Sequence, residues 1–201
     1  MQLYWYPGSC SLAPHIVLHA IGAEFDPVKV DLFTKTLENG ESYLAINPHG
    51  ALPALGMDNG EVLTEAAVIL QYLADLKPEA ELVAPAGSLE RYRQQESLNY
   101  LASDIHKAFS ILVNPTAPDD FKATIRSQLT DRLAQIDAGL QHEDYLCGGR
   151  FSIADCYLFV ITNWSAYAAV DLSPFQALNR YRERIGSMAA VQAAMKAEGL
   201  I

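Results

Sequence analysis

The chain has 201 residues and is acidic, because 24 Asp and Glu outnumber 14 Lys and Arg and give a formal net charge of −10. It has no basic stripe to bind nucleic acid and no apolar run long enough to span a bilayer, which argues against both kinds of partner. The N-terminus has no leader pattern, and the three scattered cysteines, Cys10, Cys147 and Cys156, form no CxxC motif and give no disulfide framework, so we expect a cytoplasmic protein.

The first 80 residues alternate between the periodicities of strand and helix. The predicted elements are a strand at 2–6, a helix from 12 to a stop at Gly22, a strand at 25–30, a short helix at 43–46, strands at 52–57 and 61–63, and a helix at 67–76. Asn59-Gly60 between the last two strands is a strong hairpin signal. A strand–helix–strand unit followed by a hairpin predicts an α/β fold with a small, mixed, four-stranded sheet.

Cys10 stands between the first predicted strand and the first predicted helix. A cysteine at a helix N-terminus meets free backbone N–H groups and the positive end of the helix dipole, and both favour the reactive thiolate. The alternative is a loop cysteine without a chemical role. Position alone favours the reactive interpretation.

Beyond residues 78–88, which carry Pro78, Pro85 and Gly87 and are interpreted as a linker, the pattern is helical. One apolar face runs through 98–112 and another through 121–140. Ser152 and Asp155 have the spacing of a variant capping box and introduce an almost wholly apolar helix over 156–170. We therefore predict an α/β domain at 1–77 and an all-helical domain at 89–201.

Several short segments spread along the chain match the motifs of one family in order and spacing. They are residues 6–15 (YPGSCSLAPH), 47–55 (NPHGALPAL), 63–65 (LTE), 71–75 (QYLAD), 98–107 (LNYLASDIHK) and 151–155 (FSIAD). Together they make the chain resemble the cytosolic glutathione S-transferases, in particular the bacterial beta class. The resemblance implies a thioredoxin-like first domain and glutathione as co-substrate.

The resemblance assigns glutathione-binding roles to residues of the first domain. They are Cys10 beside the sulfur, Lys35 at the glycyl carboxylate, Leu52 with a cis Pro53 at the cysteinyl backbone, and Glu65 with Ala66 at the γ-glutamyl end. Each has a plainer alternative. Without the resemblance, Lys35 is a surface lysine, Pro53 an ordinary trans proline and Glu65 only a partner of the helix dipole.

In the helical domain, Asn99, Ser103 and His106 share a polar face at helical spacing. The resemblance implies a homodimer in which Asn99 and Ser103 reach the partner's glutathione, with His106 near the sulfur and with Asp104 and Ile105 in the same set. An unperturbed histidine titrates near pH 6.5, so His106 could act as donor or base. The alternative is a polar face in solvent.

Position 5 departs from the family pattern, because Trp5 stands where tyrosine is common and a phenol cannot activate the thiol there. Tyr4 and Tyr6 should face the other side of the strand, which leaves Ser9 and Ser11 as hydroxyl donors. The residues predicted to face an apolar electrophile are Trp5, Phe109, Tyr157, Trp164 and Tyr167. His15 and His19 lack an obvious third ligand, so we expect no metal site.

The leading hypothesis is conjugation of reduced glutathione to hydrophobic electrophiles, with Cys10, Ser11 and His106 as the catalytic residues. A second hypothesis keeps the site but uses Cys10 for glutathione-dependent thiol–disulfide exchange or peroxide reduction. A dithiol cycle is excluded because Ala13 stands where a second cysteine would be needed. The third hypothesis is a carrier of apolar ligands with little catalysis.

Overall fold

The computed structural model describes residues 1–201, which form two compact units. The N-terminal unit comprises residues 1–83 and 188–201, and the helical unit comprises residues 84–187. The break after residue 83 lies within the predicted linker. None of the helices combines the length and the apolar character that crossing a membrane requires.

The N-terminal unit is built on a mixed sheet with the order β3-β2-β1-β4-β5. Its strands are β1 (Gln2–Trp5), β2 (Asp26–Asp31), β3 (Thr36–Leu37), β4 (Ala54–Gly56) and β5 (Val62–Thr64). β1 pairs parallel with β2 and antiparallel with β4, and β5 is antiparallel to β4, as the strand–helix–strand unit and the hairpin predict. β3 is an additional strand. Its two residues lie in a polar stretch and are too short to show a periodicity.

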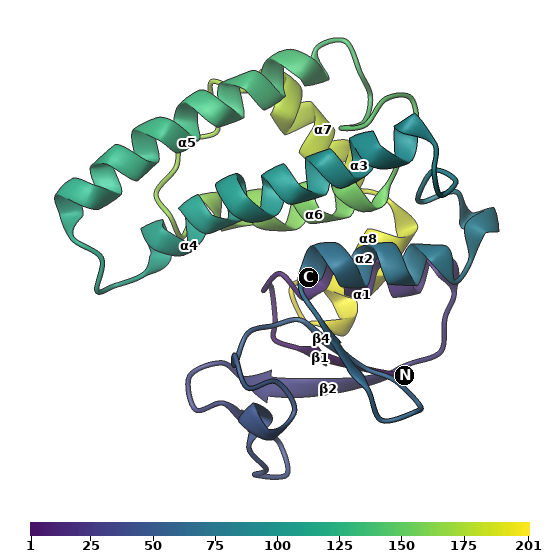
Figure 1. The fold of residues 1–201 in the computed structure, drawn as a ribbon. Coiled ribbons are helices and arrows are strands. Elements are labelled where there is room, and N and C mark those ends of the chain that lie inside the picture. Colours follow the sequence, from purple (N-terminus) through teal and green to yellow (C-terminus); the bar gives the residue numbers. More distant parts are fainter. The chain divides into compact units, whose positions relative to one another are not determined.

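The helices of this unit are α1 (Leu12–Ile21), α2 (Ala66–Asp75) and α8 (Ala189–Ala197), with single 3₁₀ turns η1 (Tyr43–Ala45) and η2 (Pro78–Ala80). Figure 1 shows α1 and α2 over one side of the sheet, and α2 contacts β4 and β5. α1 ends at the predicted stop, because Gly22 adopts a left-handed conformation and its N–H bonds back to the last turn. The other face of the sheet packs Tyr4 against Tyr43 of η1.

α8 packs on α1, although residues 188–201 were assigned to the helical domain in the prediction. Val191 and Ala194 are the buried residues of α8. The apolar stripe of a helix shows that one face is covered, but it does not show which distant element covers it. The C-terminal segment therefore joins the unit that carries Cys10.

The helical unit contains one fully buried helix, α6 (Ile153–Thr162). It contains α3 (Leu89–Tyr100), a π-helical segment η3 (Leu101–His106), α4 (Lys107–Val113), α5 (Asp119–Leu140), α6 (Ile153–Thr162), a 3₁₀ turn η4 (Asn163–Ser165) and α7 (Gln176–Gly186). Every residue of α6 is buried, and α6 contacts α3, η3 and α7. In Figure 1, α3 and α4 continue one another and run alongside α6.

The capping box predicted for α6 is confirmed. Asp155 Oδ2 accepts from the Ser152 backbone N–H and from its hydroxyl, and the Ser152 side chain bonds the backbone at Asp155. The predicted end of this helix at 170 is wrong, because α6 ends at Thr162. There the Thr162 hydroxyl bonds back to the carbonyls of Leu158 and Phe159, and a 3₁₀ turn follows.

Candidate functional site

The Cys10 thiol lies at the start of α1, in the turn that joins β1 to this helix. Its Sγ donates to the Leu52 carbonyl oxygen at 3.0 Å, and only 8 % of the residue is exposed. The turn is closed by the Ser9 N–H bonding to the Tyr6 carbonyl at 3.1 Å. The predicted location of Cys10 at a helix N-terminus is therefore confirmed.

The predicted thiolate at Cys10 is wrong for the free chain. Burial raises the pKa of the Cys10 thiol to about 12, and the negative charge of Glu65 adds to the increase. The backbone N–H groups of Cys10 and Ser11 lower this pKa, as expected at a helix N-terminus, but burial outweighs them. Cys10 is consequently a neutral thiol that donates a hydrogen bond.

Lys35 and Cys10 bond to the two ends of the segment 50–52. Lys35 Nζ donates to the Gly50 carbonyl oxygen at 2.8 Å, and Cys10 holds the carbonyl of Leu52. The next peptide bond, Leu52–Pro53, is cis, as the resemblance implies. The structure thus brings four of the residues assigned to glutathione binding into one neighbourhood.

The middle of this segment is fixed from η1 and the loop that follows it. The Tyr43 hydroxyl and the Asn47 side-chain amide both donate to the Ala51 carbonyl oxygen, at 2.7 and 2.8 Å. Tyr43 and Asn47 are almost completely buried. The backbone groups of Leu52 are therefore presented from a segment whose preceding residue is held by two side chains.

Glu65 precedes α2 and has an unusual backbone conformation, with φ 70° and ψ 116°. Its carbonyl accepts from Val68 and Ile69, while its side chain is exposed. The N–H groups at the start of a helix lack intrahelical partners, so Ala66 begins a segment suited to a carboxylate. Lys35 also has a positive φ, of 56°. Both residues belong to the set predicted to bind the ends of glutathione.

Ser11 is turned into its own loop. Its hydroxyl is fully buried, accepts from the Tyr6 N–H at 3.2 Å and lies 2.7 Å from the Ser9 hydroxyl. These bonds support the turn that carries Cys10. The catalytic role of Ser11 stays a prediction.

Trp5 packs beside α1. Its ring lies 6.0 Å from the ring of His15, and Lys29 Nζ lies 6.0 Å from the indole. The Tyr4 hydroxyl bonds to Gln2, a residue that alternates to the same side of β1. A role for Trp5 towards an electrophile stays a prediction.

In the helical unit, the polar face predicted from α-helical spacing passes through the π-helical segment η3. Asn99 and Ser103 are exposed, while Ile105 is fully buried. Asp104 accepts from the Ser103 hydroxyl at 2.7 Å and pairs with Arg132 at 2.9 Å. π-Helical turns occur mostly as short insertions and frequently at functional sites.

His106, at the end of η3, belongs to an aromatic cluster. Its Nδ1 lies 2.6 Å from the Tyr157 hydroxyl, and its ring lies 4.9 Å from that of Trp164. Phe109 packs edge-on against Trp164 at 6.4 Å. Two of the predicted electrophile-facing residues therefore contact His106, and a third, Phe109, joins the cluster through Trp164. Tyr167, which is 83 % exposed, has no described contact with this cluster.

The pKa of His106 departs from the value of an unperturbed histidine. Burial lowers the pKa of His106 to about 4, and the positive charge of Lys107 acts in the same direction. His106 is therefore neutral at physiological pH. It can accept a proton or share a hydrogen bond with Tyr157, but it does not supply a positive charge.

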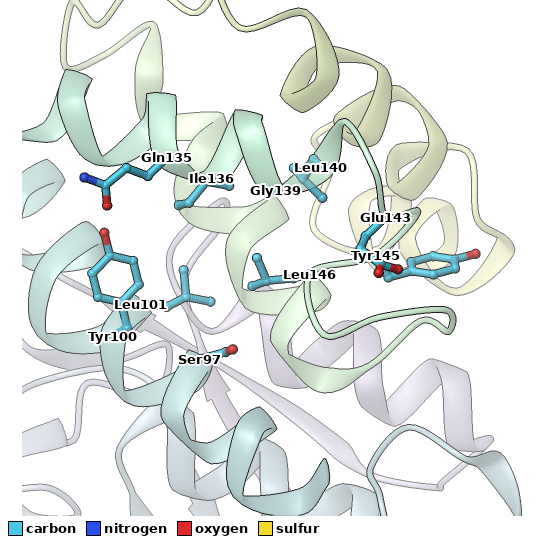
Figure 2. Close-up of a pocket in the computed structure, with 10 residues that line it drawn as sticks. All are labelled: Ser97, Tyr100, Leu101, Gln135, Ile136, Gly139, Leu140, Glu143, Tyr145 and Leu146. Atoms are coloured by element: carbon cyan, nitrogen blue, oxygen red, sulfur yellow. The ribbon is translucent and has the colours of Figure 1, made fainter.

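A separate cavity of about 300 Å³ lies within the helical unit (Figure 2). It is lined by Ser97, Tyr100, Leu101, Gln135, Ile136, Gly139, Leu140, Glu143, Tyr145 and Leu146. These residues come from α3, η3, α5 and the loop before α6. None of them was predicted to contact a ligand.

The sequence interpretation also missed Glu198, just beyond α8. Its carboxylate bonds to the Gly8 N–H in the Cys10 loop and to His15 on α1, both at 2.9 Å. Its partners lie 190 and 183 residues away along the chain. No local pattern signals contacts of this range.

Two domain families match the sequence. "Glutathione S-transferase, N-terminal domain" matches residues 1–75, and "Glutathione S-transferase, C-terminal domain" matches residues 100–188. The chain is 44 % identical over 200 residues to glutathione S-transferase GstA of Escherichia coli O157:H7, with all of both chains covered.

Two solved structures are similar over the full length of both chains. One is a sphingomonad glutathione S-transferase complexed with glutathione, with a TM-score of 0.96 and 45 % identity. The other is the bacterial beta-class glutathione S-transferase of Sphingomonas chungbukensis, with a TM-score of 0.97 and 45 % identity. The chain belongs to the glutathione S-transferase family of enzymes and to its bacterial beta class.

Proposed function

We propose that the chain conjugates reduced glutathione to hydrophobic electrophiles. The observation that carries this proposal is the backbone of Lys35 and Glu65, the residues assigned to the two ends of glutathione. Both have a positive φ, which is rare outside glycine, costs free energy and tends to occur at ligand sites. Glutathione as co-substrate is supported by the sphingomonad relative, which was solved as a complex with it.

The chemistry of the tripeptide suits these groups. Its γ-glutamyl end carries an ammonium, which the exposed Glu65 carboxylate can pair with, and a carboxylate, which suits the N–H groups at the start of α2. Its glycyl carboxylate matches the Lys35 ammonium. Its central residue can extend the sheet through the backbone groups of Leu52. Because the chain is acidic overall, an anionic ligand such as glutathione needs local positive groups, and the Lys35 ammonium and the start of α2 supply them.

The protonated state of Cys10 favours glutathione itself as the nucleophile. A thiol with a raised pKa attacks disulfides and peroxides poorly, so exchange through Cys10 is the weaker hypothesis. In conjugation to a chlorinated nitrobenzene, the glutathione sulfur forms a bond to the ring carbon, chloride leaves, and the thiol proton passes to solvent. Cys10 then lies beside the sulfur as a neutral hydrogen-bond donor, with neutral His106 assigned to the same step.

The test is turnover of a chlorinated nitrobenzene with reduced glutathione by the wild type and by Cys10→Ala. We expect both proteins to bind glutathione-agarose and their conjugation rates to agree within about threefold, because the thiol is not a covalent nucleophile. Loss of conjugation in the variant would overturn the role given to Cys10. A wild type that neither binds the matrix nor turns over the substrate would overturn conjugation itself and favour the apolar carrier.

We further propose a homodimer, with Asn99 and Ser103 directed to the partner's glutathione. Both side chains are exposed, as this role requires. Sedimentation should give about twice the mass of one chain, and Asn99→Ala should weaken glutathione binding. A monomer that binds glutathione normally would contradict this assembly. The cytoplasmic location stays a prediction.

A further inference from the structure

One carboxylate of the C-terminal segment bonds to both sides of the Cys10 loop, the turn at residues 6–11 between β1 and α1. Glu198 Oε2 accepts from the Gly8 N–H at 2.9 Å, and Glu198 Oε1 lies 2.9 Å from His15 Nδ1. Gly8 comes two residues before Cys10, and His15 comes five residues after it. The carboxylate therefore bridges the turn and the first part of α1, with the thiol between its two attachment points.

Both attachments are buried. The side chain of Glu198 is 0 % exposed and that of His15 is 2 % exposed. A carboxylate that is removed from water requires hydrogen bonds to its oxygens, and here each oxygen has one partner. The His15 ring is itself held between aromatic neighbours, stacked on His19 at 5.1 Å and edge-on to Phe25 at 5.3 Å. The helix end of the bridge is thus fixed.

The chain end beyond α8 also lies against the turn that contains Gly8. A Cβ at Gly8 would lie 3.6 Å from Leu200 Cδ2, so Leu200 lies close to this residue, and the Leu200 N–H bonds back to Met195 at the end of α8. Gly8 has a φ of 67°, a conformation that leaves its N–H directed to Glu198. The turn that carries Cys10 is therefore held from the C-terminus as well as by its own bonds.

We propose that Glu198 is a positioning residue that keeps the Cys10 loop closed, with the thiol against the Leu52 carbonyl. Its side chain is long enough to bond to Gly8 and His15 at the same time, and these two hydrogen bonds, rather than its charge, hold the loop. The inference deepens the proposed function, since the loop is where the glutathione sulfur is assigned. The experiment that tests the role of Glu198 uses no glutathione, so its outcome does not depend on whether the chain conjugates glutathione.

The experiment measures the rate at which excess iodoacetamide alkylates Cys10 in the full chain, followed by mass spectrometry of the Cys10 peptide. A buried thiol reacts through local opening, so the rate reports the population of the open loop. Glu198→Asp keeps the charge but is too short to reach both partners, and we expect alkylation about tenfold faster, the effect of losing one such bond. Glu198→Ala should accelerate the alkylation of Cys10 by at least the same factor.

Glu198→Gln separates reach from charge. The carboxamide oxygen can accept from the Gly8 N–H and the carboxamide N–H can donate to His15 Nδ1, so we expect a rate within about threefold of the wild type. Val191→Ala is the matched control, because it removes a fully buried contact of α8 that touches neither Gly8 nor His15 in the described bonds.

We expect Val191→Ala to lower the melting temperature and leave the Cys10 rate unchanged. A wild-type rate in Glu198→Asp would overturn the proposal. So would equal acceleration in the Gln and Asp variants, or in the Val191 and Asp variants. If Glu198→Ala does not fold, the Asp and Gln pair decides.

Discussion

Each unit of the chain buries one carboxylate that collects several hydrogen bonds, and the two differ in how far along the chain their donors lie. Asp155 in the helical unit bonds to Leu146, Ser152 and Tyr181, all within 26 residues. Glu198 in the N-terminal unit bonds to partners 183 and 190 residues away. The bond between Ser152 and Asp155 in the first network follows from a capping motif that can be read in the sequence, whereas no local motif signals the bonds of Glu198.

The same two units each hold a titratable side chain whose charged form is disfavoured by burial. Burial raises the pKa of Cys10 to about 12 and lowers that of His106 to about 4, so both side chains are uncharged at neutral pH. Position along a helix predicted a charge-stabilised thiolate at the first site. Desolvation, which depends on the whole fold, outweighs that local effect.

The largest expected effect comes from breaking the Asp155 network. Asp155→Ala should lower the free energy of unfolding by about 4 kcal/mol, because it leaves several buried donors unsatisfied at once. Urea denaturation of the variant measures the change. Asp131→Ala, at an exposed position of α5, should change stability by less than about 0.5 kcal/mol. Equal effects of the two variants would show that the network adds nothing to stability.

The next largest expected effect is the pH dependence of stability that follows from the lowered pKa of His106. Its pKa is lowered on folding, so its contribution to stability is present above the unfolded pKa, near 6.5, and is lost as pH falls towards 4. Between pH 8 and pH 5 we expect the wild type to lose about 2 kcal/mol more than His106→Gln, which keeps a hydrogen-bonding group without titrating. Parallel stability curves for the two proteins would contradict the buried, neutral state.

Lys35→Gln should raise the KM for reduced glutathione about tenfold while kcat changes little, because a charge-assisted bond to the glycyl carboxylate is lost. Steady-state kinetics with a chlorinated nitrobenzene gives both constants. Lys196→Gln, at an exposed position of α8, removes the same charge from the same unit and should leave the KM unchanged. An equal rise in both variants would mean that only the overall charge matters.

Glu65→Gly should stabilise the fold and weaken the binding of glutathione. Glycine adopts a positive φ without steric cost, so unfolding should require about 1 kcal/mol more free energy, while the KM for glutathione rises. Glu65→Gln keeps the strain and removes the charge, so it should raise the KM without the gain in stability. A glycine variant no more stable than the glutamine variant would show that the backbone is not strained.

The elements that were predicted correctly are those with local causes. Gly22 ends α1, Asn59-Gly60 joins β4 to β5, and Ser152 with Asp155 begins α6, each through contacts within a few residues. The strand β3 was missed because two residues carry no period. The π-helical segment that ends at His106 was missed because a helical spacing of apolar residues does not distinguish the two helix types.

The candidate site divides in the same way. Cys10 lies at the start of the first helix, as its position predicted, and the Leu52–Pro53 bond is cis, as the resemblance implied. The protonation of Cys10 and the contact with Glu198 depend on burial and on a helix at the far end of the chain. These properties could not be read from the sequence.

The central claim is that burial keeps Cys10 neutral, so that glutathione supplies the nucleophile. The most direct measurement is a pH titration of thiolate absorbance, recorded as wild type minus Cys10→Ala so that Cys147 and Cys156 cancel. The account predicts no difference signal up to about pH 10, because the pKa of Cys10 is raised to about 12. A thiolate signal with a midpoint below about pH 8 would contradict it.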